Sequence, residues 1–293
     1  MITSTYRQIF PYPYIHHLVI LIFKNSMDWT VISATNNENI LKSCLLNSPD
    51  IREASDVILQ RGYASAAAAY NSAIDKARSD LLVFVHQDVY LPQGWLASLQ
   101  RALDLLSEVD PNWGVAGVYG VNKSWDDGTG FLYCAEYGRL GNSFDGVREV
   151  RSLDEVLLVM RKSSNLRFDE RLPGFHMYGA DICLEARRRG MKSYAISAFC
   201  IHNTNGYRML PLQFWRCYLF MRKKWRLELP VATSCTEITF GCWPMIRWNI
   251  ARAANIALGR YRATTRFADP GRFYLDLTSR DASLLPAAEC KPR

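Results

Sequence analysis

Short apolar runs alternate with helix-forming stretches between Trp29 and Tyr119, and this alternation restricts the possible folds more than any other feature of the sequence. A strand–helix period of about 25 residues is typical of βα units that build a largely parallel sheet. We therefore predict an α/β fold in which ligands bind at the carboxyl ends of the strands. The expected strands are Trp29–Ala34, Asp56–Gln60, Asp80–Val85 and Trp113–Tyr119, and the expected helices are 39–47, 65–76 and 92–107.

The character of the chain changes after these units. Gly and Asp dominate 120–148, which predicts loops. From 207 the chain is aromatic, basic and helix-like, and a polar tail follows position 265. Three parts are therefore expected: an irregular extension over 1–26, an α/β domain over 27–206, and a basic, aromatic, helical region over 207–293. The domain is completed by an apolar run at Val156–Met160, a helix at Tyr178–Gly190 and a strand at Ser193–Ile201.

The net charge of +7 is concentrated in one part of the chain. Between Ala186 and Ala268 there are 15 Lys and Arg residues but only two acids, Glu228 and Glu237. Such asymmetry favours an anionic partner for this region. The basic residues alternate with Trp, Phe, Leu and Met, which suits an anionic membrane surface better than nucleic acid. Arg208–Arg226 is the helix that we expect to lie at such a surface, the alternative being a helical cap that packs on the core.

Neither a metal-binding cysteine motif nor a membrane-spanning segment is evident. None of the eight cysteines forms a CxxC pair, which favours free thiols in a reducing cytoplasm. The apolar run Leu18–Phe23 is far shorter than the roughly 20 residues that a spanning helix needs. We therefore expect a cytoplasmic protein.

Polar residues follow the apolar strand Asp80–Val85 directly, in the order His86, Gln87, Asp88. His86 and Asp88 are two residues apart on an extended segment, so both side chains point to the same side. A carboxylate at the end of a buried strand can hold a divalent cation against a diphosphate. The alternative is that Asp88 caps the following turn and His86 packs at the edge of the sheet.

Two further polar residues stand at the ends of expected elements. Asp181 falls in the first turn of the helix expected within 174–190, where the helix dipole stabilises a carboxylate and where a general base could act. His202 follows the strand that ends at Ile201. Each also has a purely structural interpretation, as a helix N-terminal acid and as a hydrogen-bonded histidine. Phosphate-loop, dinucleotide-binding, zinc-protease and serine-hydrolase motifs are all missing from the sequence.

Taken in order, these segments resemble the family-two inverting glycosyltransferases. More narrowly, the chain is similar to the bacterial glycosyltransferase-like branch in which the metal motif reads His-Gln-Asp. The resemblance spans 29–205 and rests on WTVISATNNE, AYNSAIDKARSDLLVFVHQDVYLP, LRFDERLPGFHMYGADICLEARRRG and the terminal IHN.

The resemblance implies a GT-A fold that binds a nucleotide-diphosphate sugar together with Mg²⁺ or Mn²⁺. Asp88 would bind the metal, His202 would complete its ligands, and Asp181 would be the catalytic base of a single inverting displacement. Asn71 would support the diphosphate side of the pocket or pack beneath it. The remaining donor-binding positions implied are Thr35, Asn36, Glu38, His86 and Gln87.

The resemblance also implies a glycan or lipid-linked acceptor, as in polysaccharide or glycolipid assembly at the inner face of a membrane, and no nucleic-acid partner. The sequence departs from the family pattern at two positions. His86 replaces the first acid of the metal motif, and Ala180 replaces the glutamate that usually precedes the base. The alternative function is therefore an inactive module that binds sugar nucleotides.

Overall fold

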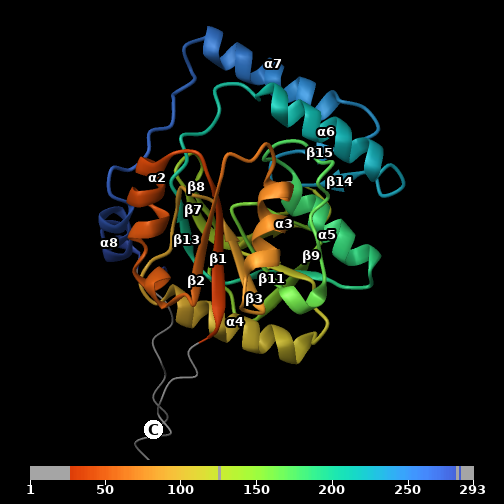
Figure 1. Cartoon of the computed structure of the whole chain (residues 1–293). Coiled ribbons are helices and arrows are strands. Elements are labelled where there is room, and N and C mark those ends of the chain that lie inside the picture. Colours follow the sequence, from red (N-terminus) through yellow and green to blue (C-terminus); the bar gives the residue numbers. More distant parts are fainter. Residues whose placement is uncertain (1–26, 125–126, 282–283, 285–293) are drawn as a thin grey trace, which may run out of the picture.

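The computed structural model describes residues 27–124, 127–281 and 284. The extension expected over 1–26 lies outside the described residues. The centre of the fold is a mixed sheet of seven strands with helices on both faces (Figure 1). In order across the sheet the strands are β2 (Asp56–Arg61), β1 (Trp29–Thr35), β3 (Leu81–Val85), β11 (Leu157–Arg161), β5 (Val115–Gly117), β12 (Ser193–Ile196) and β9 (Val147–Val150).

The expected α/β fold is confirmed. Strands β2, β1 and β3 are parallel neighbours, while β11 runs antiparallel between β3 and β5. β12 is parallel to β5, and β9 is antiparallel to β12. Only β11 and β9 therefore oppose the other five strands, and the ends of β1, β2 and β3 meet at one edge, as predicted for the site.

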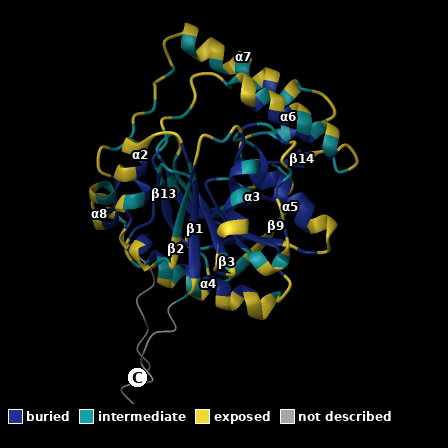
Figure 2. Ribbon diagram, viewed as in Figure 1, coloured by how far each residue is buried: buried dark blue, intermediate teal, exposed yellow. Residues whose placement is uncertain are grey.

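Both faces of the sheet are buried, which explains why β3 reads as a continuous apolar run. Leu82 and Phe84 belong to one core cluster, whereas Val83 and Val85 belong to the other. The first cluster lies under α3 (Ala66–Lys76) and α5 (Tyr178–Arg188). The second lies under α2 (Glu38–Ser43) and α4 (Trp95–Val109), and Figure 2 shows the buried strands between these helices.

The prediction of loops over 120–148 was wrong, because this stretch contributes to a second sheet. Its glycines allow paired strands to approach closely. A Cβ on Gly130 would lie 2.3 Å from the Val118 carbonyl oxygen, so only glycine fits at this position. The strand expected at Ser193–Ile201 is also divided between the two sheets. In order, the second sheet contains β10 (Ser152–Leu153), β6 (Tyr119–Val121), β7 (Thr129–Cys134), β13 (Cys200–His202) and β4 (Val89–Tyr90), with β8 (Gly138–Gly141) beside β7.

The C-terminal region is helical, but it is not a separate layer. Helix α6 (Leu212–Lys224) buries its aromatic residues Phe214 and Tyr218, together with Trp225 at its C-terminal cap, in the core. The helix expected at a membrane surface over 208–226 therefore packs these aromatic side chains on the domain instead. The expected polar tail contains a helix, which packs on the second sheet through Tyr274. The remaining elements are β14 (Val231–Ala232), β15 (Glu237–Ile238), α7 (Trp243–Ala257), α8 (Pro270–Arg280) and the short helices Leu45–Asn47, Pro49–Glu53 and Lys162–Ser164.

Within the described ranges, no helix combines the length and the apolarity that crossing a bilayer would require.

Candidate functional site

Strand pairing brings His202 to the metal motif. After β3 the chain passes through His86, Gln87 and Asp88 and enters β4, which pairs antiparallel with β13 so that His202 lies opposite Val89. The amide of Asn203 donates to the Asp88 carbonyl at 2.8 Å. Asp88 and His202, which are 114 positions apart in the chain, are therefore held side by side by the backbone hydrogen bonds of their neighbours.

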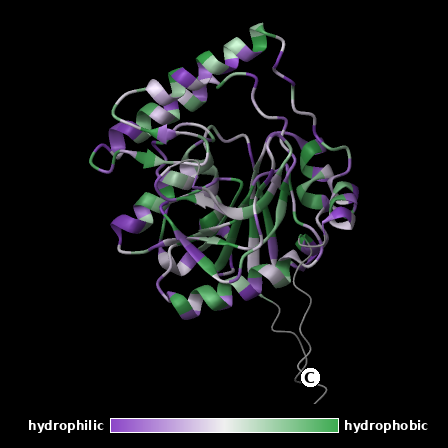
Figure 3. Ribbon diagram, turned by 180° about the vertical axis from the view of Figure 1, so that it is seen from behind, coloured by the Kyte–Doolittle hydropathy of each residue, from purple (hydrophilic) through white to green (hydrophobic). Residues whose placement is uncertain are grey.

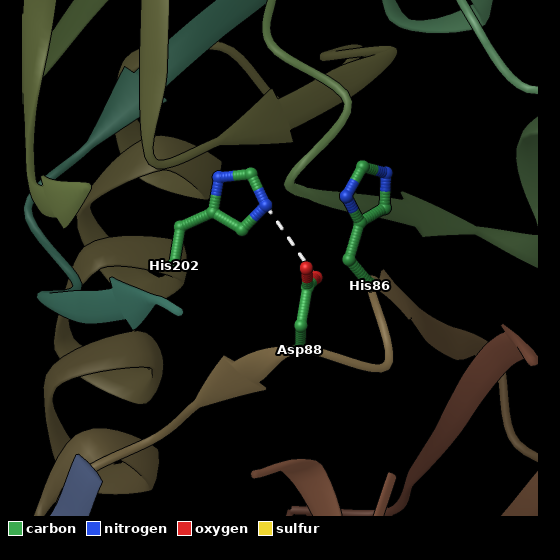
Figure 4. A group of neighbouring side chains, drawn as sticks. All are labelled: His86, Asp88 and His202. Atoms are coloured by element: carbon green, nitrogen blue, oxygen red, sulfur yellow. Dashed lines mark ion pairs between the residues drawn. The ribbon is translucent and has the colours of Figure 1, made fainter. Parts of the chain in front are cut away.

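The side chains of His86, Asp88 and His202 converge (Figure 4). One ligand atom from each lies within 4.8 Å of the other two, and His202 Nε2 is 3.4 Å from Asp88 Oδ1. All three side chains are partly accessible. The structure therefore brings these three residues together, and their role in metal binding stays a prediction.

Hydrogen bonds favour one tautomer of His86. The Tyr178 hydroxyl is 3.1 Å from the Glu155 carbonyl oxygen, which can only accept. His86 Nε2 is 2.8 Å from the same hydroxyl. When the hydroxyl donates to Glu155, Nε2–H of His86 donates to Tyr178. Nδ1 then carries the lone pair, and in Figure 4 it faces Asp88 and His202.

The pKa shifts of the three residues set their charges. Burial alone would raise the pKa of Asp88, but His202, His86 and Arg266 outweigh it and lower that pKa. Burial and then His202 lower the pKa of His86. Burial alone would lower the pKa of His202 as well, but Asp88 outweighs it and raises that pKa. At neutral pH the group thus offers an ionised carboxylate and a neutral His86 imidazole, and a cation that binds His202 displaces its proton. Two imidazole nitrogens and one carboxylate oxygen are ligands that Mn²⁺ and similar transition metals accept, so these residues fit a divalent cation.

Gln87 joins the metal motif to the end of β1. Its Oε1 accepts from Thr35 Oγ1 at 2.7 Å and from the amides of Asn36 and Asn37 at 3.1 and 3.0 Å. Its Nε2 donates to Asn36 Oδ1 at 2.7 Å. Three predicted donor-binding residues, Thr35, Asn36 and Gln87, therefore lie together. They lie beside the group formed by His86, Asp88 and His202, which we call the metal group because it is the candidate metal site. The side-chain amide of Gln87 positions the loop that follows β1.

Two other predicted donor-binding residues have different surroundings. Glu38 forms an ion pair with Arg61 at 2.6 Å, and both side chains are half exposed. Asn71 is buried; its amide donates to the Phe168 carbonyl at 2.9 Å and accepts from the Phe168 amide at 3.0 Å. Of the two alternatives for Asn71, these bonds favour packing beneath the pocket.

Asp181, which the family resemblance implies as the catalytic base, is not part of the group formed by His86, Asp88 and His202. Its side chain is buried, and its Oδ1 accepts from Lys224 Nζ at 2.7 Å and from Trp225 Nε1 at 2.7 Å. The same ammonium is 2.9 Å from carboxylate oxygens of Asp169 and Glu185. Asp181 and Asp88 share none of the partners found for them. Asp181 thus holds α6 against α5 instead of lying in an open pocket, and its catalytic role stays a prediction.

Three neighbours of the site were not predicted. Tyr178 orients His86 from the first position of α5. Glu155 directly precedes the apolar run of β11, and its carboxylate accepts from the amide of Met177 at the start of α5. Arg266 Nη2 lies 3.6 Å from Asp88 Oδ2. Tyr178 and Glu155 could have been found as polar residues at the edges of expected elements, whereas nothing in the sequence around Arg266 points to the site.

A family model described as a glycosyltransferase-like family matches residues 30–214. A protein of Fuscovulum blasticum named "ATP synthase subunits region ORF 6" is 31% identical over 168 residues, which are 55% of this chain and 66% of that protein. This chain thus spans slightly less than two thirds of that relative.

Solved structures overlap with the chain more remotely. GalNAc-T7 with UDP, GalNAc and Mn²⁺ is 10% identical, covers 61% of this chain and 44% of its own, and has a TM-score of 0.45. The mannosyltransferase PcManGT from Pyrobaculum calidifontis with GDP-Man and Mn²⁺ is 13% identical, with coverage of 87% and 80% and a TM-score of 0.45. S. aureus TarS is 14% identical, with coverage of 68% and 39% and a TM-score of 0.42.

If Asp181 is structural, Asp181→Asn lowers the stability of the protein. The substitution removes the charge that faces Lys224 in a buried cluster, and disturbing such a pair costs about 2–4 kcal/mol. We expect thermal unfolding to shift downward by roughly 3–7 °C. Asp75→Asn, which breaks the exposed Arg167–Asp75 pair, is the control and should unfold like the wild type. Equal melting temperatures for all three proteins would contradict the structural role.

Proposed function

The chain belongs to the glycosyltransferase-like family, and on this premise we propose that it transfers a sugar from a nucleotide-diphosphate donor to an acceptor hydroxyl with inversion. The observation that carries the proposal is the convergence of His86, Asp88 and His202 at the carboxyl end of β3. A divalent cation held by these residues would neutralise the charge that grows on the departing diphosphate. A thermal-shift screen of nucleotide sugars with Mn²⁺ tests the donor class, because no stabilisation by any of them would contradict it.

Mn²⁺ is the cation that we propose, rather than Mg²⁺. Two of the three candidate ligands are imidazoles, whereas Mg²⁺ prefers oxygen ligands in octahedral geometry. We expect Mn²⁺ to bind at least about tenfold more tightly than Mg²⁺, as measured by loss of the free Mn²⁺ electron paramagnetic resonance signal and by competition with Mg²⁺. Asp88→Ala should abolish this binding, while Asp75→Ala should not. Equal affinity for the two cations, or unchanged Mn²⁺ binding in Asp88→Ala, would refute the assignment.

Arg266 is the residue that we propose for contact with the diphosphate. Its guanidinium lies beside Asp88, and its Nε is buried without a hydrogen-bond partner in the described part of the chain. A guanidinium presents its N–H groups in a planar fork that matches phosphate oxygens. The side chain is held there because Asn203 exchanges two hydrogen bonds with the backbone of Phe267, at 2.9 and 2.8 Å. We propose that Arg266 donates to the diphosphate as the sugar departs.

Arg266→Met should therefore weaken the binding of a nucleoside diphosphate by about 10- to 100-fold, as measured by calorimetry in the presence of Mn²⁺. Arg266→Lys keeps the charge but loses the fork, so an intermediate affinity is expected. Arg262→Met, in the same segment with an exposed side chain, is the matched control. Wild-type affinity in Arg266→Met would exclude the contact.

Inversion requires a base on the acceptor side of the donor sugar. Asp181 is the base implied by the family resemblance, but its carboxylate is occupied by Lys224 and Trp225. Glu155 is supported instead by its position: the next residue, Val156, accepts the amide of His86, and the Glu155 side chain is partly accessible. Burial, and then Asp154, raise the pKa of Glu155 to about 8. A carboxylate of raised pKa is a stronger base once it is ionised, so Glu155 would act as a base above about pH 8.

Glu155→Gln should lower kcat by about 10²- to 10⁴-fold while the affinity for the donor changes little, because only proton transfer is lost. Asp181→Asn, assayed below its melting temperature, should keep a kcat within about tenfold of the wild type. The reverse pattern, in which Asp181→Asn is inactive and Glu155→Gln is active, would restore Asp181 as the base.

The acceptor is proposed as a class only: the hydroxyl of a glycan or of a lipid-linked sugar, as in polysaccharide or glycolipid assembly on the cytoplasmic side of a membrane. The alternative is a module that binds sugar nucleotides without transferring them, which the departures at His86 and Ala180 suggest. Slow hydrolysis of any sugar nucleotide with Mn²⁺ would exclude this alternative.

A further inference from the structure

Helix α7 exposes a row of large apolar side chains. Trp243, Ile246, Ile250 and Leu258 are 64%, 38%, 60% and 61% exposed, and Phe240, just before the helix, is 70% exposed. Their spacing of three, four and eight positions places them on one side of the helix. Figure 3 shows apolar and polar residues alternating along α7 at the margin of the molecule.

The opposite side of α7 is already used for packing. Met245 is fully buried. Arg252 donates to Glu136 at 2.8 Å and to the Tyr207 carbonyl at 2.7 Å, and its guanidinium lies over the rings of Trp248 and Tyr261. The rotation of α7 is therefore fixed, and its apolar row cannot turn inward without breaking these bonds.

The charge around this row has one sign. No acid occurs between Glu237 and Asp269, while Arg247, Arg260 and Arg262 are exposed. Leu275 of α8, an exposed aliphatic residue on another helix, is in contrast followed by Asp276. An apolar row flanked only by arginines is complementary to a surface that is apolar within and anionic at its boundary.

We propose that the α7 face, defined by Phe240, Trp243, Ile246, Ile250 and Leu258, docks into the headgroup region of an anionic lipid bilayer. A second copy of the chain suits this face less well, because a two-fold contact through it would bring arginines of both copies together. A nucleic acid would leave the apolar row without a partner. The proposal goes beyond the transfer reaction, since it concerns a surface that contributes no residue to the metal group.

Docking through α7 would hold the site next to the lipid. Arg252 ties the helix to Glu136, which lies two residues beyond the end of β7. The last residue of β7, Cys134, is paired with His202. In Figure 1, α7 lies at the same end of the molecule as the carboxyl ends of β1 and β3.

The test is flotation of the full chain with vesicles of phosphatidylcholine alone or of phosphatidylcholine with phosphatidylglycerol. We expect binding only to the anionic vesicles. Ile250→Asp should lower the bound fraction about tenfold or more, because a charge replaces an apolar side chain at the boundary. Leu275→Asp is the matched control, since Leu275 is 66% exposed on another helix, and it should float like the wild type. Arg247→Glu and Arg272→Glu form a second pair, of which only the first should reduce binding.

Three results would overturn the proposal. One is a wild-type chain that fails to float with anionic vesicles. Another is a pair of variants, Ile250→Asp and Leu275→Asp, that bind equally. An equal loss in both would mean that the effect is not specific to α7. No loss in either would mean that the affinity resides elsewhere, such as in residues 1–26, which both variants keep. The third is a dimer in vesicle-free light scattering that Ile250→Asp converts to a monomer, which would assign the face to a second copy. Unchanged thermal unfolding of both variants ensures that folding does not explain a loss.

Discussion

The short pairing between β4 and β13 is the interaction on which the site depends. It places His202 beside Asp88, and the next residue, Asn203, forms hydrogen bonds with three separate segments. The Asn203 amide bonds to the Asp88 carbonyl, while its side chain bonds to Cys44 and to the backbone of Phe267. One buried asparagine thus fixes the metal motif, the segment after α2 and the returning C-terminal segment relative to one another. Because it is buried, each unmade bond would carry a desolvation cost.

The sequence predicted the central sheet and singled out His86, Asp88 and His202 because both leave local signals. A buried strand reads as an apolar run, and polar residues directly after it mark the edge where strands end. His86, Gln87 and Asp88 were found in this way, and His202 was found at the end of a later strand of the same kind. The second sheet was missed because the glycines that allow Gly130 to approach β6 closely give the same signal as loops.

Contacts between distant segments could not be predicted from the same patterns. Asp181 reads as an acid at a helix N-terminus in either role. Only the structure places Lys224 against it, from a helix more than 40 residues later. Three carboxylates around one buried ammonium are held by attraction in a medium of low dielectric. Arg266 is a similar case: nothing in its neighbours distinguishes it from the other arginines of a basic region, and its importance comes from the fold of the backbone that carries it.

The C-terminal third of the chain returns to the site, so it cannot be treated as a module separate from the α/β domain. The family match ends at residue 214, yet the partner of Asp181, the anchor of α7 and the guanidinium beside Asp88 all come from positions 224, 252 and 266. The domain is therefore not separable at the boundary that sequence similarity suggests. Replacing the C-terminal third by that of a relative would change the surroundings of Asp88 and the packing of the domain together.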